Sequence, residues 1–321
     1  MEARAIVVTR RLPGVPFDAL ASRFRAGDPP PDGTMAREEL LRRARGASGI
    51  LCTLPDRVDG DLMNAAGSAL EVISIFAVGV NNIDVAEATR RGIRVCNTPD
   101  VLTDATADLG FALLLAAARK LPEAERHIRE GRWTGWDPWG FLGVPVAGKT
   151  LGIVGMGKIG AAVARRSRGF SMRVLYNGRR RLPPATEAEL GAAFRDLDAL
   201  LAESDFVVLC VPLNPETRGL ISRERLARMR RTAVLVNISR GEVVAEEALA
   251  EALAEGRIFG AGIDVYEKEP RVHPALLAAK STALSPHIGS ATRDAREAMG
   301  RLAAENLVAV LEGREPPCPV N

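Results

Sequence analysis

The chain alternates between short apolar, β-branched runs and amphipathic stretches rich in Ala, Leu and Arg, and this alternation constrains its fold more than any other feature. Buried runs separated by helical stretches are typical of a parallel sheet whose strands are joined through helices. The expected strands of a first unit are 5–9, 49–53, 72–77 and 94–97, and those of a second unit are 151–155, 173–177, 206–211, 233–238, 260–265 and 282–284.

Helical stretches fill most of the gaps between these runs. Thr103 or Asp104 is expected to cap a long helix that continues to Lys120, and further helices are expected at 158–170, 195–202, 223–230 and 246–255. Six strands in the second unit complete a doubly wound sheet, so a last helix, from about Ser290 to Leu311, is expected to return to the first unit. We therefore predict an α/β protein with a discontinuous first domain, residues 1–100 and 292–321, and a second domain, residues 101–291.

The composition narrows the class of protein. Of the 321 residues, 47% are hydrophobic and 26% are charged, as in folded proteins, and the net charge of +3 provides no basic surface of the kind that binds nucleic acid. We expect a cytoplasmic protein with no membrane or nucleic-acid partner, because neither a signal peptide nor a membrane-spanning segment is recognisable. The cysteines are too widely spaced for a metal-ligand motif, and we expect four free thiols and no metal. They are Cys52, Cys96, Cys210 and Cys318.

The sequence GMGKIG at 155–160 directly follows an apolar strand, opens an amphipathic helix and precedes a second strand at βαβ spacing. In this context the three glycines indicate a dinucleotide-binding loop of the Rossmann type. Gly155 permits the tight turn, Gly157 lets the main chain approach a pyrophosphate, and Gly160 lets the helix lie close to the strand. The alternative is a purely structural turn between strand and helix.

The end of the next strand bears on the choice of cofactor. A site for NAD usually places Asp or Glu there, to bind the ribose 2′-hydroxyl. This chain has NGRRR at 177–181 instead. Arginines attract a 2′-phosphate, so the turn favours NADP(H), with NAD(H) as the alternative cofactor. An exposed basic turn without a function is the competing interpretation.

Side chains that can take part in a reaction follow three further strands. Arg240 follows the run 233–238, Glu267 and Glu269 follow 260–265, and His287 follows 282–284. Since ligands bind outside the carboxyl ends of parallel strands, these residues are expected at the same edge of the sheet as the glycine loop. Arg240 can hold a substrate carboxylate with two parallel hydrogen bonds and polarise an adjacent carbonyl group.

Of the three histidines, His287 alone lies at the carboxyl end of an expected strand, where a catalytic residue is expected. His127 lies in a charged helical stretch and His273 in a loop beside a proline, and both are expected at the surface. Hydride transfer to a ketone requires a proton donor that ionises near neutral pH, and His287 fits this requirement. Either Glu269 or Glu267 can stabilise its imidazolium form. A structural, capping histidine is the alternative.

With these residues, the chain closely resembles the D-isomer-specific 2-hydroxyacid dehydrogenases, and within them the glyoxylate/hydroxypyruvate reductases. The resemblance extends from Gly49 to Thr292. Several long motifs in the family's order are more specific than the glycine loop alone. They are AVGVNNID at 77–84, NTPDVLTDATAD at 97–108, VPLNPETRG at 211–219, NISRG at 237–241, GIDV at 262–265 and PHIGS at 286–290.

The resemblance implies that the first, flavodoxin-like domain binds the substrate, and it assigns individual residues. The catalytic set is Arg240, Glu269 and His287, since the family's acid directly precedes a proline. The implied substrate-binding residues are Val78, Gly79, Arg240, His287, Ser290 and Trp139. The implied cofactor-binding residues are Thr106, Gly155, Gly157, Lys158, Ile159, Gly160, Asn177, Arg179, Arg180, Cys210, Pro212, Thr217, Ile238, Arg240, Asp264, His287 and Gly289.

The implied roles of these residues differ. The main-chain amides of Val78 and Gly79 would bind the substrate carboxylate, and Thr106 and Asp264 would lie near the nicotinamide. All three tryptophans lie within 133–139, and the resemblance implies that one of them, with Trp139 the first choice, reaches the substrate pocket of a neighbouring subunit. A tryptophan-rich dimer interface without substrate contact is the alternative.

The resemblance also implies an activity, which is the NADPH-dependent reduction of glyoxylate, hydroxypyruvate or both, to glycolate or D-glycerate, by a homodimer. One alternative is a phosphoglycerate dehydrogenase or another D-2-hydroxyacid dehydrogenase. A second alternative, from a different class, is a nucleotide-sensing binding protein similar to the corepressors that share this fold.

Overall fold

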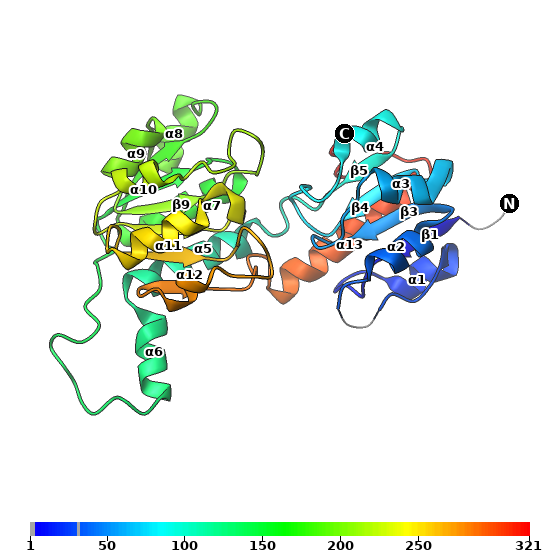
Figure 1. Cartoon of the computed structure of the whole chain (residues 1–321). Coiled ribbons are helices and arrows are strands. Elements are labelled where there is room, and N and C mark those ends of the chain that lie inside the picture. Colours follow the sequence, from blue (N-terminus) through cyan, green and yellow to red (C-terminus); the bar gives the residue numbers. More distant parts are fainter. Residues whose placement is uncertain (1–3, 31–32) are drawn as a thin grey trace. The chain divides into compact units, whose positions relative to one another are not determined.

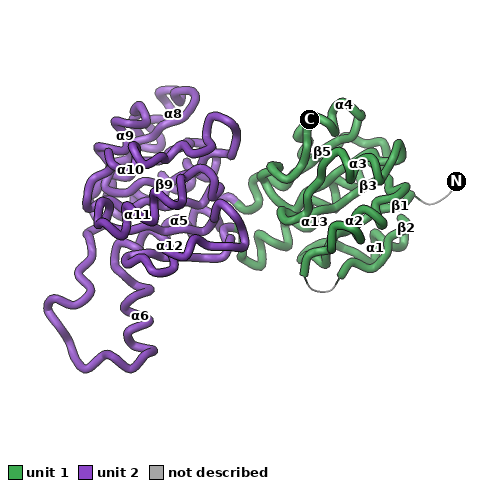
Figure 2. The backbone as a smooth tube through the Cα atoms, viewed as in Figure 1, with its two compact units in different colours: residues 1–102, 290–321 green, residues 103–289 purple. Residues whose placement is uncertain are grey.

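The chain divides into two compact units in the computed structural model, which describes residues 4–30 and 33–321 (Figures 1 and 2). Unit 1 is formed by the described residues up to Leu102 together with Ser290–Asn321, and unit 2 by Thr103–Gly289. Each unit is built around its own parallel β-sheet. The expected α/β class, with two parallel-sheet units and a discontinuous first unit, is therefore confirmed.

Unit 1 contains a five-stranded sheet in the order β2-β1-β3-β4-β5, with every pair parallel. This is the flavodoxin-like order of a doubly wound sheet. Its strands are β1 (Ala5–Val8), β2 (Arg25–Ala26), β3 (Ala47–Cys52), β4 (Val72–Ile75) and β5 (Arg94–Cys96), and its helices are α1 (Phe17–Arg23), α2 (Arg37–Ala44), α3 (Gly60–Ala66), α4 (Val85–Arg90) and α13 (Arg293–Leu311).

The last helix, α13, returns to the sheet of unit 1, as expected. Thr292 caps it by accepting a hydrogen bond from the N–H of Ala295 at 3.2 Å. The helix packs on β3, β4 and β5. Small buried residues, among them Ala303, allow close contact, and the hydroxyl of Ser74 on β4 donates to the carbonyl oxygen of Ala303 at 2.8 Å.

Unit 2 contains a seven-stranded parallel sheet in the order β12-β11-β10-β9-β6-β7-β8. Counted from β6, the first six strands have the Rossmann order, and β12 extends the sheet beyond it. The strands are β6 (Thr150–Val154), β7 (Arg173–Asn177), β8 (Ala192–Phe194), β9 (Phe206–Leu209), β10 (Val234–Asn237), β11 (Gly260–Ile263) and β12 (Thr282–Leu284).

The helices of unit 2 cover both faces of this sheet (Figure 1), and α5 is the longest of those in the described residues. It packs on β10, β11 and β12, where Gly262 and Gly110 keep the surfaces close. No helix in the described residues is long and apolar enough to cross a bilayer. The helices are α5 (Thr103–Ala118), α6 (Leu121–Arg129), α7 (Lys158–Ser167), α8 (Pro184–Leu190), α9 (Leu197–Glu203), α10 (Arg223–Arg228), α11 (Glu246–Ala254) and α12 (Pro274–Ala278).

The expectation of six strands in the second unit was wrong, because β8 adds a seventh at the sheet edge. Only three residues long and without a β-branched residue, β8 gives no strand pattern to recognise. The two-residue strand β2 was missed for the same reason. The helix expected to begin at Arg195 begins at Leu197 instead.

The packing of α13 generates a stability prediction. At Gly300 an added Cβ would lie 1.8 Å from the carbonyl oxygen of Pro13, so the helix and the chain before α1 are in direct contact there. Intrinsic helix propensity alone would make Gly300→Ala stabilising by about 1 kcal/mol. We expect the reverse, a loss of about 1 to 3 kcal/mol from overpacking, measured by urea denaturation. Comparing Glu305→Ala with Glu305→Gly on the same helix measures propensity alone, and a stabilised Gly300→Ala would contradict the contact.

Candidate active site

The glycine loop has the geometry that its sequence predicts. Gly155 follows β6 with φ of +99°, and an added Cβ would lie 2.8 Å from the carbonyl carbon of Cys210, so only glycine fits. At Gly160 an added Cβ would lie 2.3 Å from the carbonyl oxygen of Gly155. Both glycines are therefore required for α7 to begin directly on the strand.

Gly157 is different, because an added Cβ there meets nothing within 4 Å. It is the N-cap of α7, and no side chain caps this end of the helix. The unpaired N–H groups at a helix start attract anions. An open main-chain surface beside these groups fits a dinucleotide pyrophosphate. The neighbouring Lys158 is exposed and Ile159 is half-buried.

The turn after β7 separates its arginines into two kinds. Arg181 is held by Glu187, whose carboxylate accepts its Nε at 3.0 Å and its NH2 at 2.9 Å. Arg179 and Arg180 are exposed and pair with no side chain of the described residues. Asn177 supports the turn, since its Nδ2 donates to the carbonyl oxygen of Arg195 at 2.9 Å.

The loop after β9 continues the same edge of the sheet. The N–H of Cys210 donates to the carbonyl oxygen of Val154 at 2.8 Å. The hydroxyl of Thr217 donates to the carbonyl oxygen of Pro212 at 2.6 Å and closes the loop. Burial raises the pKa of the Cys210 thiol to about 12, so this cysteine stays protonated and is no nucleophile.

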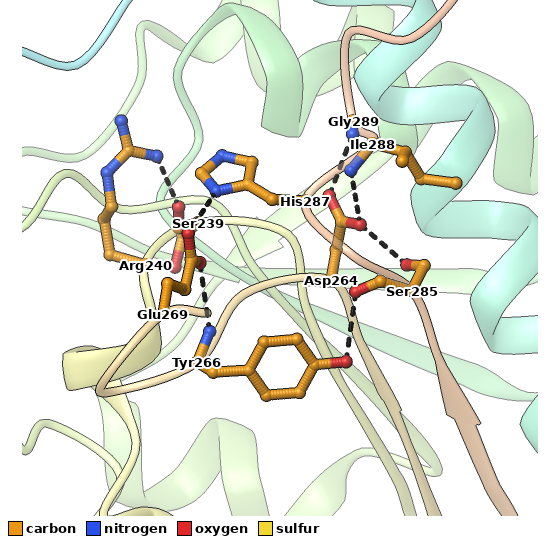
Figure 3. A network of polar contacts seen from close by, with 9 residues as sticks. All are labelled: Ser239, Arg240, Asp264, Tyr266, Glu269, Ser285, His287, Ile288 and Gly289. Atoms are coloured by element: carbon orange, nitrogen blue, oxygen red, sulfur yellow. Dashed lines mark hydrogen bonds and ion pairs between the residues drawn. The ribbon is translucent and has the colours of Figure 1, made fainter. Parts of the chain in front are cut away.

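The ends of β10, β11 and β12 bring the expected catalytic residues together (Figure 3). The Nδ1 of His287 lies 2.8 Å from Oε2 of Glu269. Within the described residues, no hydrogen bond engages its Nε2. Oε1 of Glu269 accepts the N–H of Tyr266 at 3.2 Å. His287 has a left-handed backbone, with φ of 55°, and its N–H donates to the carbonyl oxygen of Asp264 at 2.8 Å.

The charges in this cluster are interdependent. Burial would raise the pKa of Glu269, but the hydrogen bond from His287 and its charge, with help from Tyr266 and Arg240, hold that pKa below its usual value. Glu269 is therefore a carboxylate at neutral pH. Burial lowers the pKa of Arg240, whose guanidinium donates from NH1 to the carbonyl oxygen of Ser239 at 2.7 Å and remains charged.

Asp264, which directly follows β11, organises the segment that carries His287. Its Oδ1 accepts the hydroxyl of Ser285 at 2.6 Å and the N–H of Ile288 at 2.8 Å. Its Oδ2 accepts the N–H of Gly289 at 2.8 Å (Figure 3). Burial raises the pKa of this carboxyl group, and these hydrogen bonds oppose the rise.

Thr106 and Ile238 complete this part of the site. An added Cβ at Gly289 would lie 3.3 Å from Oδ2 of Asp264 and 3.5 Å from Oγ1 of Thr106, so these three residues meet. Ile238 lies beside Gly110 of α5. The structure therefore brings together Thr106, Ile238, Arg240, Asp264, Glu269, His287 and Gly289.

Three of the expected substrate-binding residues belong to unit 1, whereas the cluster described above belongs to unit 2. Val78 and Gly79 follow β4 of unit 1, and their N–H groups donate to no acceptor in the described residues. The carbonyl oxygen of Val78 accepts Nδ2 of Asn97 at 2.8 Å, which holds the turn. Ser290 also lies in unit 1, and its carbonyl oxygen accepts the N–H of Thr292 at 2.9 Å.

The three tryptophans lie on a segment that extends from unit 2 after α6 (Figure 1). Trp133 is 63% exposed, Trp136 is 86% exposed and Trp139 is 79% exposed. Phe141 and Leu142 are exposed as well. So large an apolar surface is typical of a protein–protein contact.

Sequence reasoning missed the residues that support the site. Tyr266 bonds to both segments that carry the catalytic pair. Its N–H donates to Glu269, and its hydroxyl donates to the carbonyl oxygen of Ser285, ahead of His287, at 3.0 Å. In unit 1, the buried Oδ2 of Asp56 accepts the hydroxyl of Thr9 at 2.6 Å and that of Thr53 at 2.8 Å. An acid shortly after the end of an apolar strand was the available signal for Asp56.

These features define a nucleotide-dependent oxidoreductase, with a dinucleotide loop and an acid–base pair at one edge of a parallel sheet. Residues 111–289 match the family "D-isomer specific 2-hydroxyacid dehydrogenase, NAD binding domain". The chain belongs to the D-isomer specific 2-hydroxyacid dehydrogenase family and is an NAD(P)-dependent enzyme.

Relatives and solved structures match the chain along nearly its whole length. A glyoxylate reductase of Thermococcus kodakarensis is 52% identical over 98% of this chain and 96% of its own length. A solved protein of Thermus thermophilus is 47% identical, with a TM-score of 0.91 over 99% of this chain and 100% of that one. An NADPH-dependent glyoxylate/hydroxypyruvate reductase of Sinorhizobium meliloti, solved with NADP and malonate, is 33% identical, with a TM-score of 0.87 over 99% of this chain and 97% of that one.

The glycine loop yields a paired prediction. Gly157→Ala should leave the melting temperature nearly unchanged, because its Cβ meets no atom of the chain within 4 Å. It should weaken the binding of a nicotinamide dinucleotide about tenfold or more, if the open surface beside the helix start accepts the pyrophosphate. Gly160→Ala should lower the melting temperature, because its Cβ meets the carbonyl oxygen of Gly155. Calorimetry and fluorescence titration measure the two effects. Unchanged cofactor affinity in Gly157→Ala would contradict a phosphate site at this surface.

Proposed function

We propose that the protein reduces glyoxylate, hydroxypyruvate or both with NADPH, forming glycolate or D-glycerate. The observation that carries this proposal is the His287–Glu269 ion pair beside Arg240, at the same sheet edge as the glycine loop. Relatives named glyoxylate reductase, at about half sequence identity along nearly the whole chain, support the choice of substrate.

Each unit has its own part in this proposal. Unit 2 would be the dinucleotide-binding domain, in which Thr106, Ile238, Asp264 and Gly289 would hold the nicotinamide. Cys210, Pro212 and Thr217 would hold the adenosine part. Unit 1 is the substrate-binding domain, where the N–H groups of Val78 and Gly79, which meet no acceptor in the described residues, donate to the substrate carboxylate. Ser290 contributes its hydroxyl to substrate binding.

The chemistry follows from which atoms are engaged. When bound, the reduced nicotinamide supplies a hydride to the carbonyl carbon. His287 donates a proton from Nε2 to the carbonyl oxygen, so the C=O group becomes a C–OH group with a new C–H bond. Glu269, bonded to Nδ1, fixes the ring and stabilises the imidazolium before the proton leaves. Arg240 binds the substrate carboxylate and polarises the carbonyl.

We also propose that the protein is a homodimer in which the long helix α5 and the tryptophan segment, residues 133–139, contact the partner subunit. The exposure of Trp133, Trp136 and Trp139 supports this, because isolated chains rarely expose so many large apolar side chains in one segment. Trp139 is the residue that we propose to reach the partner's substrate pocket.

The activity is tested by following NADPH absorbance with glyoxylate and hydroxypyruvate. We expect turnover with at least one, and His287→Ala should lower kcat by about a hundredfold or more while leaving the Kd of NADPH unchanged, because the proton donor acts only in the transition state. Turnover of phosphohydroxypyruvate alone would select the alternative dehydrogenase. If the protein turns over no small 2-keto acid, the proposed activity is wrong. If His287→Ala loses kcat and NADPH affinity equally, His287 is not the proton donor.

Cofactor choice is tested at the turn after β7. Replacing Arg179 and Arg180 together by Gln should weaken NADPH about tenfold or more and leave NADH nearly unchanged, because only NADPH carries the 2′-phosphate. Arg181→Gln is the matched control, since Glu187 already holds this arginine. Titration of each variant with both cofactors gives the answer. A parallel response of NADPH and NADH would show that the turn does not read the phosphate.

A further inference from the structure

Glu246 is a buried acid that the reaction does not use. It is the first residue of α11, and only 7% of its surface is exposed. Its neighbour Glu247 lies on the same helix turn and is less buried. A buried carboxylate is costly unless hydrogen bonds compensate it, so the partners of Glu246 indicate what it does.

Both partners belong to the segment that carries Glu269. Oε2 of Glu246 accepts the N–H of Glu267 at 2.7 Å, and Oε1 accepts the N–H of His273 at 2.8 Å. These two N–H groups lie on either side of Glu269 in the chain. A single carboxylate therefore joins the two ends of the loop at its base.

Packing alone does not place this loop. Its residues from Glu267 to Arg271 are all exposed, so few side-chain contacts hold them. Besides the Glu246 bonds, the N–H of Arg271 donates to the carbonyl oxygen of Lys268 at 2.8 Å. The position of Glu269 thus depends on hydrogen bonds more than on burial.

The main chain is shaped for this contact. At Gly241, just ahead of α11, an added Cβ would lie 1.9 Å from the carbonyl carbon of Tyr266 and 2.3 Å from the nitrogen of Glu267. The absence of a side chain at Gly241 therefore lets the start of the loop lie directly against the segment that leads to Glu246. The N–H of Tyr266, at this same point, donates to Oε1 of Glu269 at 3.2 Å.

We propose that Glu246 is a positioning residue that holds Glu269 in hydrogen-bonding distance of His287. This inference rests on the proposed function, in which His287 donates the proton. Without Glu246, the loop base opens and Glu269 no longer stays 2.8 Å from Nδ1. Misplacement of a group in an acid–base pair by about 1 Å can cost up to about a hundredfold in rate.

The expected signature is a loss of turnover without a loss of binding. Around His287 lie Glu269 from the loop after β11, Asp264 from the end of β11, and Arg240 from the loop after β10, which faces Glu269. Moving Glu269 away releases Nδ1 of His287, so the ring is no longer fixed in the orientation that the reaction needs. Because this pair acts on the substrate and not on the cofactor, kcat should fall while the Kd of NADPH stays unchanged.

The test compares Glu246→Ala and Glu246→Gln with the control Glu247→Gln. We expect kcat with glyoxylate to fall about tenfold or more in Glu246→Ala, while KM changes much less. Glu246→Gln keeps one acceptor oxygen and should lie between Glu246→Ala and the wild type. The Kd of NADPH should stay unchanged in all three variants, because α11 is not part of the glycine loop. Glu247→Gln should behave as wild type.

Two outcomes would overturn the inference. One is a wild-type kcat in both Glu246 variants. The other is an equal loss of NADPH affinity, which would indicate a general structural role. If the alanine variant fails to fold, as judged by its circular dichroism, the glutamine variant decides. Failure of the proposed function is distinguishable, because the wild-type protein itself would then turn over no 2-keto acid.

Discussion

The in-register ends of four neighbouring strands determine where the chemistry can occur. Leu209, Asn237, Ile263 and Leu284 end β9 to β12 and are paired side by side across the sheet. The buried strands contain apolar residues almost throughout, so polar side chains can appear only past this line. Arg240, Asp264 and His287 all follow within a few residues of it. The register of the sheet, rather than any single side chain, thus brings the arginine, the carboxylate and the histidine to one edge.

The buried acids of the described residues bond mainly to main-chain N–H groups and hydroxyls. Asp264 accepts two N–H groups and a hydroxyl, and Glu246 accepts two N–H groups. Asp56 accepts an N–H group and two hydroxyls in the same manner. Because these partners belong to loops, each carboxylate fixes a loop conformation that packing cannot. The Glu269–His287 pair differs, since here the carboxylate meets a side chain from another loop.

The fold and the chemical residues were predictable because they depend on local pattern. Apolar runs predicted the long strands, and the glycine spacing and strand-end positions pointed to Gly155, Arg240 and His287. The choice of Glu269 over Glu267 came from the family resemblance. What could not be predicted depends on distant partners. Glu246 resembles any acid at a helix start until its contact with residues 267 and 273 is seen, and Arg181 resembles Arg179 until Glu187 engages it. The strand β8 escaped notice because its few residues are not distinctive.

The turn after β7 also has a consequence for how such an enzyme can diversify. Arg179 and Arg180 bond to no side chain of the described residues, whereas Asn177 and Arg181 hold the turn in shape. Under the proposed function, recognition of the cofactor and the architecture of the turn thus belong to different residues within five consecutive positions. Exchanging the two exposed arginines leaves the scaffold of the turn intact. Evolution could therefore change the preference between NADPH and NADH through two surface substitutions, with little loss of folding stability.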